Sequence, residues 1–226
     1  QDRLSGKESA THKLAGDLFR SNRIAPEFAV TDASGNPVVG IETHVFRNGG
    51  VSIVTLMSNP LLRVDELGPP DFRSNKRFET PVKVTVKLPA ARYIYDSRTG
   101  KSFGQKQSVD VTVGPYEPVI FAVSSTPLPK LNIFAPAAAK LGSIVEIGIG
   151  SGTTHEATPA ANHVYHVEVV NPQGARVPHY TENLIASRGH ARKLLPLALN
   201  DPAGEWKIRI RDAFTGETKE TALAVN

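Results

Sequence analysis

The histidines come closest, by type and spacing, to a chemical site in this 226-residue sequence. The run His155–Pro159 begins His-Glu like a zinc-protease helix, but proline stands where that motif needs its second histidine. His163 and His166 would share one face of a helix, whereas on the strand expected here they point to opposite faces. We therefore expect surface or hydrogen-bonded histidines and no metal or cofactor. A metal site that also uses His155 and His179 is the alternative.

Other catalytic signatures are incomplete or missing. The run Gly148–Thr154 follows an expected strand but lacks the Gly-Lys-Ser/Thr ending and the helix that hold a phosphate. There is no Gly-x-Ser-x-Gly elbow, and with no cysteine there is no thiolate nucleophile or disulfide. No spacing pairs two carboxylates in a pocket. The sequence predicts a chain that is not itself an enzyme.

Three tyrosines are the candidate ligand-binding residues. Tyr93 and Tyr95 share one face of an expected strand, and Tyr116 lies in an expected turn, Gly-Pro-Tyr-Glu-Pro. Exposed aromatic rings of this kind can bind sugars. The alternative is that Tyr93 or Tyr95 packs in the core with its hydroxyl bound to a loop backbone. Trp206 heads an inward strand face and is expected in the core.

Short alternating runs predict the strands that must position these residues. In Val82–Leu88 and in Trp206–Arg211, apolar side chains alternate with Lys, Arg or Thr, which is typical of a strand with one solvated face. Further strands are expected at Glu42–Phe46, Val51–Met57, Ala91–Tyr95, Val109–Val113, Val119–Val123, Ile144–Ile149, Val164–Val170 and Ala222–Val225.

One helix is expected near the start of the sequence. Leu14, Leu18 and Phe19 recur at helical spacing, Ser9 or Thr11 is the expected cap, and the helix should end near residue 22, before a proline.

Two internal matches relate the halves of the chain. The segment Tyr93–Lys101 matches Arg209–Glu217, 116 positions further along the chain, because both have strand residues followed by Asp-x-x-Thr-Gly. The segment Asp32–Val38 likewise matches Asn171–Pro178. Asp or Asn can bond to the backbone two residues ahead, and Gly supplies the positive φ that such turns need. Each match therefore predicts a turn at the end of a strand.

These patterns predict an all-β fold of two tandem immunoglobulin-like antiparallel β-sandwiches with a short N-terminal helix. The expected parts are a helical segment at 1–27, a first sandwich at 28–125 and a second at 126–226. The Pro-rich run Ser124–Pro129 is the expected linker. The first half carries extra residues, which we place in an interfacial loop at Asn59–Pro81.

Charge and hydropathy exclude some partners. Lys and Arg exceed Asp and Glu by 26 − 22 = 4, and the excess is spread along the chain, so nucleic-acid binding is not expected. The longest apolar runs fall well short of the roughly 18 residues that a membrane span needs.

The chain resembles a known family in its turn and strand motifs. The runs Val38–Met57, Tyr93–Lys101 and Gly114–Val123 look like the C-terminal β-sandwich of bacterial family 42 glycoside hydrolases and related β-galactosidase-like proteins. Residues 127–226 resemble the immunoglobulin-like or macroglobulin-like modules of large bacterial secreted proteins. In that family the catalytic carboxylates lie in an upstream barrel, and none of them has a counterpart here.

The resemblance implies a non-catalytic accessory region of a larger secreted or periplasmic carbohydrate-active protein. Such a region would serve domain packing, spacing or interaction, with the upstream domain of the same polypeptide as its partner. The first residue is not Met, which fits a mature fragment or a piece of a longer chain. The alternative is a module that binds a glycan or a cell-surface protein through Tyr93, Tyr95 and Tyr116.

Overall fold

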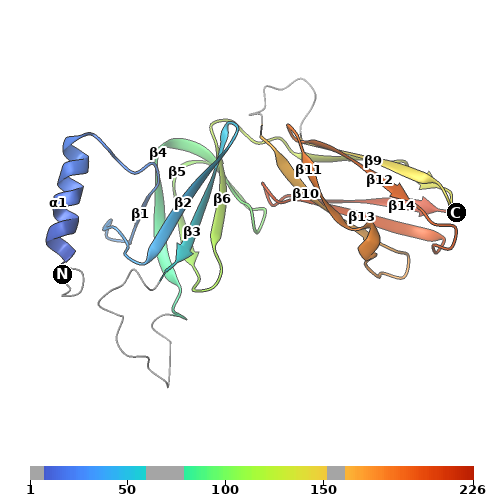
Figure 1. The fold of residues 1–226 in the computed structure, drawn as a ribbon, viewed down its shortest axis with the longest axis horizontal. Coiled ribbons are helices and arrows are strands. Elements are labelled where there is room, and N and C mark those ends of the chain that lie inside the picture. The colour runs from blue at the N-terminus through green and yellow to red at the C-terminus, as the bar shows by residue number, and fades with distance from the viewer. Residues whose placement is uncertain (1–7, 60–78, 152–160) are drawn as a thin grey trace, which may run out of the picture. The chain divides into compact units, whose positions relative to one another are not determined.

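A computed structural model describes residues 8–59, 79–151 and 161–226, and confirms the all-β class (Figure 1). The elements run in the order α1 (Glu8–Ser21), β1 (Ala29–Thr31), β2 (Ile41–Asn48), β3 (Val51–Ser58), β4 (Val82–Asp96), β5 (Ser102–Val113), β6 (Val119–Ser124), β7 (Leu131–Phe134), β8 (Ala138–Ala139), β9 (Ile144–Ser151), β10 (His163–Val170), a 3-10 turn (Pro178–Tyr180), β11 (Glu182–Ala186), β12 (His190–Pro196), β13 (Gly204–Asp212) and β14 (Thr218–Val225). The expected loop at Asn59–Pro81 and the run His155–Pro159 fall almost wholly outside the described residues.

The chain divides into two compact units. The first holds residues 1–45, 54–92 and 105–119, and the second holds 46–53, 93–104 and 120–226. The second unit therefore includes the turn between β4 and β5, together with the whole C-terminal half. The sequence-based bounds at 27/28 and 125/126 stay a prediction.

Long strands build the N-terminal sheet. Its order is β1-β4-β6-β3-β2, with β5 also paired to β4. The two runs expected at Val82–Leu88 and Ala91–Tyr95 form one strand, β4, in which Val84, Val86 and Ile94 are buried. Lys83 and Lys87 lie on the opposite, exposed face, as the alternation predicts.

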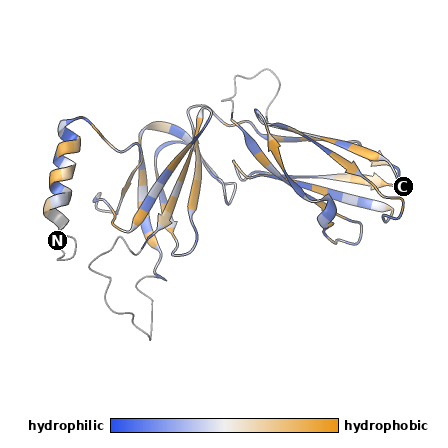
Figure 2. Ribbon diagram, in the orientation of Figure 1, coloured by the Kyte–Doolittle hydropathy of each residue, from blue (hydrophilic) through white to orange (hydrophobic). Residues whose placement is uncertain are grey.

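Two sheets enclose the core of the C-terminal sandwich. A five-stranded sheet of order β11-β10-β13-β14-β8 and a three-stranded sheet of order β12-β9-β7 share one hydrophobic cluster. Figure 2 shows hydrophobic and hydrophilic residues alternating along these strands. Trp206, Ile208 and Ile210 are fully buried, which confirms the inward face of β13 and the core position of Trp206. The pairing is antiparallel except at β14 and β8, which run parallel.

Helix α1 is confirmed, but not its cap. It begins at Glu8, so Ser9 and Thr11 lie inside it, and it ends at Ser21. Its apolar stripe is exposed, with Leu14 72% and Leu18 61% accessible. Among the described residues, no helix is long and apolar enough to cross a membrane.

Five strands had no expected counterpart: β1, β7, β8, β11 and β12. Four of them are only two to five residues long. In β12 a lysine occupies an inward position: Lys193 is 4% exposed and its amine lies 2.5 Å from Oε1 of Glu182. Alternation of apolar and polar residues predicts that a lysine points outward, so an inward lysine hides the strand pattern. The inward position is tolerated here because a carboxylate pairs with the amine.

Candidate functional site

The repeated turns have the same hydrogen bonds in both copies. After β4, the amide of Gly100 donates to the carbonyl of Asp96 at 2.8 Å, and after β13 Gly216 donates to Asp212 at 2.8 Å. The carboxylate Oδ1 of each aspartate accepts the amide two residues ahead at 2.9 Å. Both glycines have positive φ, 73° and 75°. The internal match is therefore a match of structure as well as of residue type.

The second internal match is equally close. Oδ1 of Asp32 accepts the amides two and four residues ahead at 2.8 Å, and Oδ1 of Asn171 accepts the corresponding amides at 3.1 and 2.9 Å. The backbone bond from Asn36 lowers the pKa of Asp32 most, because it stabilises the ionised carboxylate. Asn171 makes the same turn without a charge.

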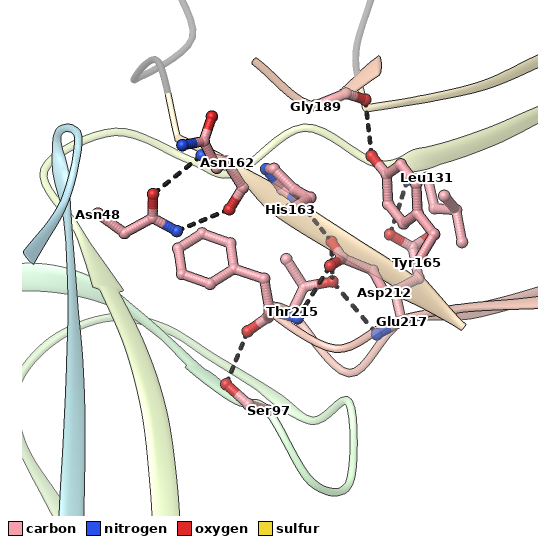
Figure 3. Close-up of polar contacts among 11 residues, drawn as sticks. Asn48, Ser97, Leu131, Asn162, His163, Tyr165, Gly189, Asp212, Thr215 and Glu217 are labelled. Carbon is pink, nitrogen blue, oxygen red and sulfur yellow. Dashed lines mark hydrogen bonds and ion pairs between the residues drawn. The ribbon is translucent and has the colours of Figure 1, made fainter. Parts of the chain in front are cut away.

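The second copy of the Asp-x-x-Thr-Gly turn carries a buried polar cluster (Figure 3). Oδ2 of Asp212 lies 2.8 Å from Nδ1 of His163 and accepts the Thr215 hydroxyl at 3.0 Å. The side chains of His163 and Asp212 are only 2% and 1% exposed. The edge of one ring faces the other between His163 and Phe214, with centroids 5.0 Å apart. We call His163, Asp212 and Thr215 the His–Asp–Thr cluster.

The His–Asp–Thr cluster has the residue types of a hydrolase triad but not its arrangement. A triad needs the hydroxyl to donate to the histidine, so that the histidine can take its proton. Here the Thr215 hydroxyl donates to the carboxylate instead. Burial also keeps substrate from both side chains. The cluster therefore acts as a structural network that satisfies a buried carboxylate.

Sequence reasoning missed this cluster because it treated Asp212 as a turn residue only. The pairing of Tyr165 with Asp212 across β10 and β13 brings the start of β10 to the turn. The histidine two residues before Tyr165 then lies on the same face of β10. The cluster could have been suspected from Asp212 and an inward-facing histidine on another strand. Which strands are paired, and in which register, cannot be derived from one sequence.

Further contacts inside the second unit hold the two repeated turns. The Ser97 hydroxyl donates to the carbonyl of Phe214 at 2.6 Å, and Nη2 of Arg211 donates to the carbonyl of Ser97 at 2.7 Å. The Asn48 side chain accepts the amide of Asn162 at 2.9 Å and donates to its carbonyl at 2.7 Å. These residues come from the stretches 46–53, 93–104 and 120–226 of one compact unit.

The structure places the three candidate tyrosines differently. Tyr93 and Tyr95 share one face of β4, as predicted, and both are half-buried. The Tyr95 hydroxyl accepts the amide of Leu128 at 2.9 Å. Tyr116 is 77% exposed and belongs to the first unit, whereas Tyr93 and Tyr95 belong to the second. A hydrogen bond from its hydroxyl to Glu79 raises the pKa of Tyr116. Ligand binding by the three tyrosines stays a prediction.

The candidate histidines within the described residues lie in β10 and in the 3-10 turn. His163 is buried at the inward face of β10, and His166 points to the other face, where its ring contacts the side chain of Asn183 at 2.8 Å. The His179 ring lies beside that of Tyr180, with centroids 4.2 Å apart. Within the described ranges, no three His, Asp or Glu side chains are grouped as metal ligands.

The first unit carries an open depression of mixed polar and apolar lining over β4 and β5. Lys83, Thr85, Asp110 and Thr112 are among the residues that line it. The Thr85 hydroxyl donates to Asp110 at 2.7 Å. Ala33, Val84 and Val111 also line it, and no aromatic residue is among its described lining residues, so it offers hydrogen bonds and small aliphatic side chains but no ring on which a sugar could stack.

No family model matches the chain, and no curated protein matches it. Solved structures that the chain matches include an alpha-2-macroglobulin from E. coli (12% identity, TM-score 0.33, 79% of this chain and 19% of that chain). They also include the adhesin InvE from Yersinia pseudotuberculosis (12%, 0.34, 83% and 60%) and a family 2 glycosyl hydrolase from Bacteroides cellulosilyticus (10%, 0.32, 66% and 23%). The chain thus spans less than two thirds of each of these structures. At these TM-scores the likeness carries no conclusion about function.

Proposed function

We propose that this chain is a non-catalytic accessory β-sandwich region of a larger secreted or periplasmic carbohydrate-active protein. It serves domain packing, spacing or interaction, and its first partner is the upstream domain of the same polypeptide. The parent is of the glycoside-hydrolase type, as the resemblance to the family 42 C-terminal sandwich implies.

The observation that carries this proposal is that the side chains of the His–Asp–Thr cluster are buried and bonded to one another. Its carboxylate accepts a backbone amide, a hydroxyl and a histidine contact, and its two ionisable side chains are 2% or less exposed. The residues that most resemble a catalytic set are thus engaged in closing a turn. At the same turn in the first half the aspartate, Asp96, is half-buried, so the histidine partner occurs at the copy whose carboxylate is buried.

Hydrolysis and parent stability test the proposal together. Purified 1–226 is assayed with a panel of 4-nitrophenyl glycosides, and folding is followed by circular dichroism. We expect a folded chain with no turnover above buffer. We also expect the full-length parent to lose thermal stability when these residues are deleted. Saturable turnover proportional to the concentration of folded chain, or a parent that melts unchanged after the deletion, would overturn the proposal.

A binding module for a glycan or a cell-surface ligand is the second candidate. The exposed ring of Tyr116, at 77%, favours it. Binding on a glycan array that Tyr116→Ala removes and Tyr116→Phe retains, with unchanged circular dichroism, would support this alternative. Binding that Tyr116→Ala, Tyr93→Ala and Tyr95→Ala all leave intact would exclude these tyrosines.

A further inference from the structure

The two outer faces of the C-terminal sandwich differ in chemistry. On the five-stranded sheet, Arg209 of β13 lies 3.2 Å from Glu168 of β10 and 3.1 Å from Glu220 of β14. Lys207 lies 3.9 Å from Glu220. Cross-strand ion pairs thus cover the centre of this solvated face, and the exposed apolar residues Val164 and Ile185 are paired at its β11 edge.

The outer face of the three-stranded sheet carries exposed apolar residues on all three of its strands. Phe134 of β7, Ile144 of β9 and Leu194 of β12 are 65%, 67% and 48% exposed. The register places Leu194 opposite Glu146 and Pro196 opposite Ile144. Because these positions alternate with buried Val145 and Leu195, their side chains all lie outside the core. We call this surface, formed by Asn132, Phe134, Ile144, Glu146, Arg192 and Leu194, the Phe134 face.

Glycine gives the Phe134 face a flat centre. One row across the sheet joins Arg192 of β12, Gly148 of β9 and Phe134 of β7. A Cβ built on Gly148 would meet Cβ of Phe134 at 3.5 Å and Cδ2 of its ring at 3.8 Å. The ring thus covers the bare backbone of the neighbouring strand, as aromatic residues do beside strand glycines. With 65% of Phe134 exposed, its other ring face meets solvent.

Polar groups surround the exposed ring. In the same row Arg192 lies 3.3 Å from Glu146, and these side chains are 63% and 60% exposed. Two residues before Phe134, Asn132 accepts a hydrogen bond from Lys219 at 3.1 Å and keeps its amide group as a donor. Donors and acceptors thus lie on both sides of an apolar platform.

The area of the Phe134 face limits the size of the ligand that it can bind. Three strands about 4.8 Å apart and up to eight residues long give a face of about 10 by 25 Å, or about 250 Å². A stable protein interface needs about 800 Å² per partner, so this face is too small for a protein or a second copy alone. A short ligand that is apolar on one side and polar at its rim fits it. A pyranose has this form, since C–H groups line one ring face and hydroxyls surround it.

We propose that the Phe134 face binds a neutral pyranose oligosaccharide. A sugar ring stacks its C–H face on the exposed, electron-rich face of Phe134. Arg192, Glu146 and Asn132 bond to the hydroxyls at the rim. The inference rests on the carbohydrate setting of the proposed function and adds a site that is independent of the three tyrosines.

NMR titration of isotope-labelled 1–226 with cellohexaose, mannohexaose and maltohexaose tests the site. We expect at least one of them to shift the amide signals of β7, β9 and β12 in a saturable way. Phe134→Ala should weaken that binding about tenfold, since an aromatic stacking contact is worth roughly that factor. Phe134→Trp should retain it. Amide signals that do not respond to any of the three sugars at millimolar concentration would overturn the inference.

Matched variants distinguish stacking on the Phe134 ring from the effect of simply covering Gly148 with a side chain. Phe134→Leu still covers the glycine but has no aromatic face, so it should bind as weakly as Phe134→Ala. Ile185→Ala removes a residue that is 81% exposed on the other sheet and should bind like the parent chain. Sugar binding that Phe134→Ala retains but Tyr116→Ala loses would overturn this site while supporting the binding alternative. The stability of the parent protein tests the accessory role separately.

Discussion

Nδ1 of His163 lies 2.8 Å from Oδ2 of Asp212, and the two side chains are 2% and 1% exposed. The contact joins the first residue of β10 to the last residue of β13. A buried carboxylate is tolerated only when its oxygens are satisfied, so the stability of this turn depends on its partners.

Removing the histidine should destabilise the C-terminal sandwich. Within the part of the chain that the structure describes, His163→Ala leaves the buried Asp212 carboxylate with two donors, the Thr215 hydroxyl and the backbone amide of Phe214. We expect the free energy of unfolding to fall by about 3 kcal/mol in urea denaturation, as for other buried pairs that lose one partner. Asp96→Asn alters the equivalent, more exposed turn and should cost less than about 1 kcal/mol. Equal losses in the two variants would contradict a special role for the buried pair.

Tyr180 ties the 3-10 turn to the segment after β12. Its hydroxyl donates to the Pro196 carbonyl or the Asp201 carboxylate, both at 2.7 Å, and accepts the amide of Ala198 at 3.2 Å. Tyr180→Phe keeps the ring but loses these bonds, and we expect a loss of about 1–2 kcal/mol in thermal or urea unfolding. A variant as stable as the parent would show that the hydroxyl contributes nothing.

Substitution by alanine at Gly216 and at Gly174 distinguishes the cost of backbone strain from the cost of steric contact. Both have positive φ, 75° and 79°. A Cβ on Gly216 would lie 2.6 Å from the amide nitrogen of Gly100, whereas one on Gly174 would meet nothing within 4 Å. Gly174→Ala should therefore cost about 1 kcal/mol from strain alone.

Gly216→Ala should cost more than Gly174→Ala, about 3 kcal/mol, because Gly100 must also move away. Unfolding midpoints of the two variants in urea, compared with the parent, measure the difference. If Gly174→Ala proved to be the more damaging change, the close approach of the two repeated turns would be disproved.

The Tyr116 hydroxyl should ionise above its ordinary value near 10. Its hydrogen bond to Glu79 raises the pKa, and the negative charge there adds to the effect. Because the folded chain holds this proton more tightly, the contribution to stability is complete below pH about 10 and is lost as pH rises through the folded pKa. Absorbance at the tyrosinate band should show a late-titrating group that Tyr116→Phe removes.

Replacing the carboxylate should restore ordinary behaviour. In Glu79→Gln the charge is gone, so the pKa of Tyr116 should fall toward its usual value. The same absorbance titration measures the change. An unshifted late phase in Glu79→Gln would mean that another group raises the pKa.

Local pattern accounts for most of what could be predicted. The alternation in Val82–Leu88 and Trp206–Arg211 predicted both strand and buried face, because side chains of a strand alternate between its sides. The turn at Asp96 was predictable because its hydrogen bonds close within five residues. Strand β12 was not, since its inward Lys193 is acceptable only beside Glu182, which belongs to another strand.

The sequence by itself determined the longer alternating strands and the turn chemistry, since each depends on residues within a few positions of one another. It also showed the repeat, since the two copies match in residue type. Only the tertiary structure decided which side chain contacts the Asp212 carboxylate, because the pairing of β10 with β13 brings His163 next to it. It likewise decided that Phe134 lies beside Gly148 on an exposed face, because strand register aligns residues that are distant in the chain. Register follows from the packing of the whole core, and one sequence read locally does not contain it.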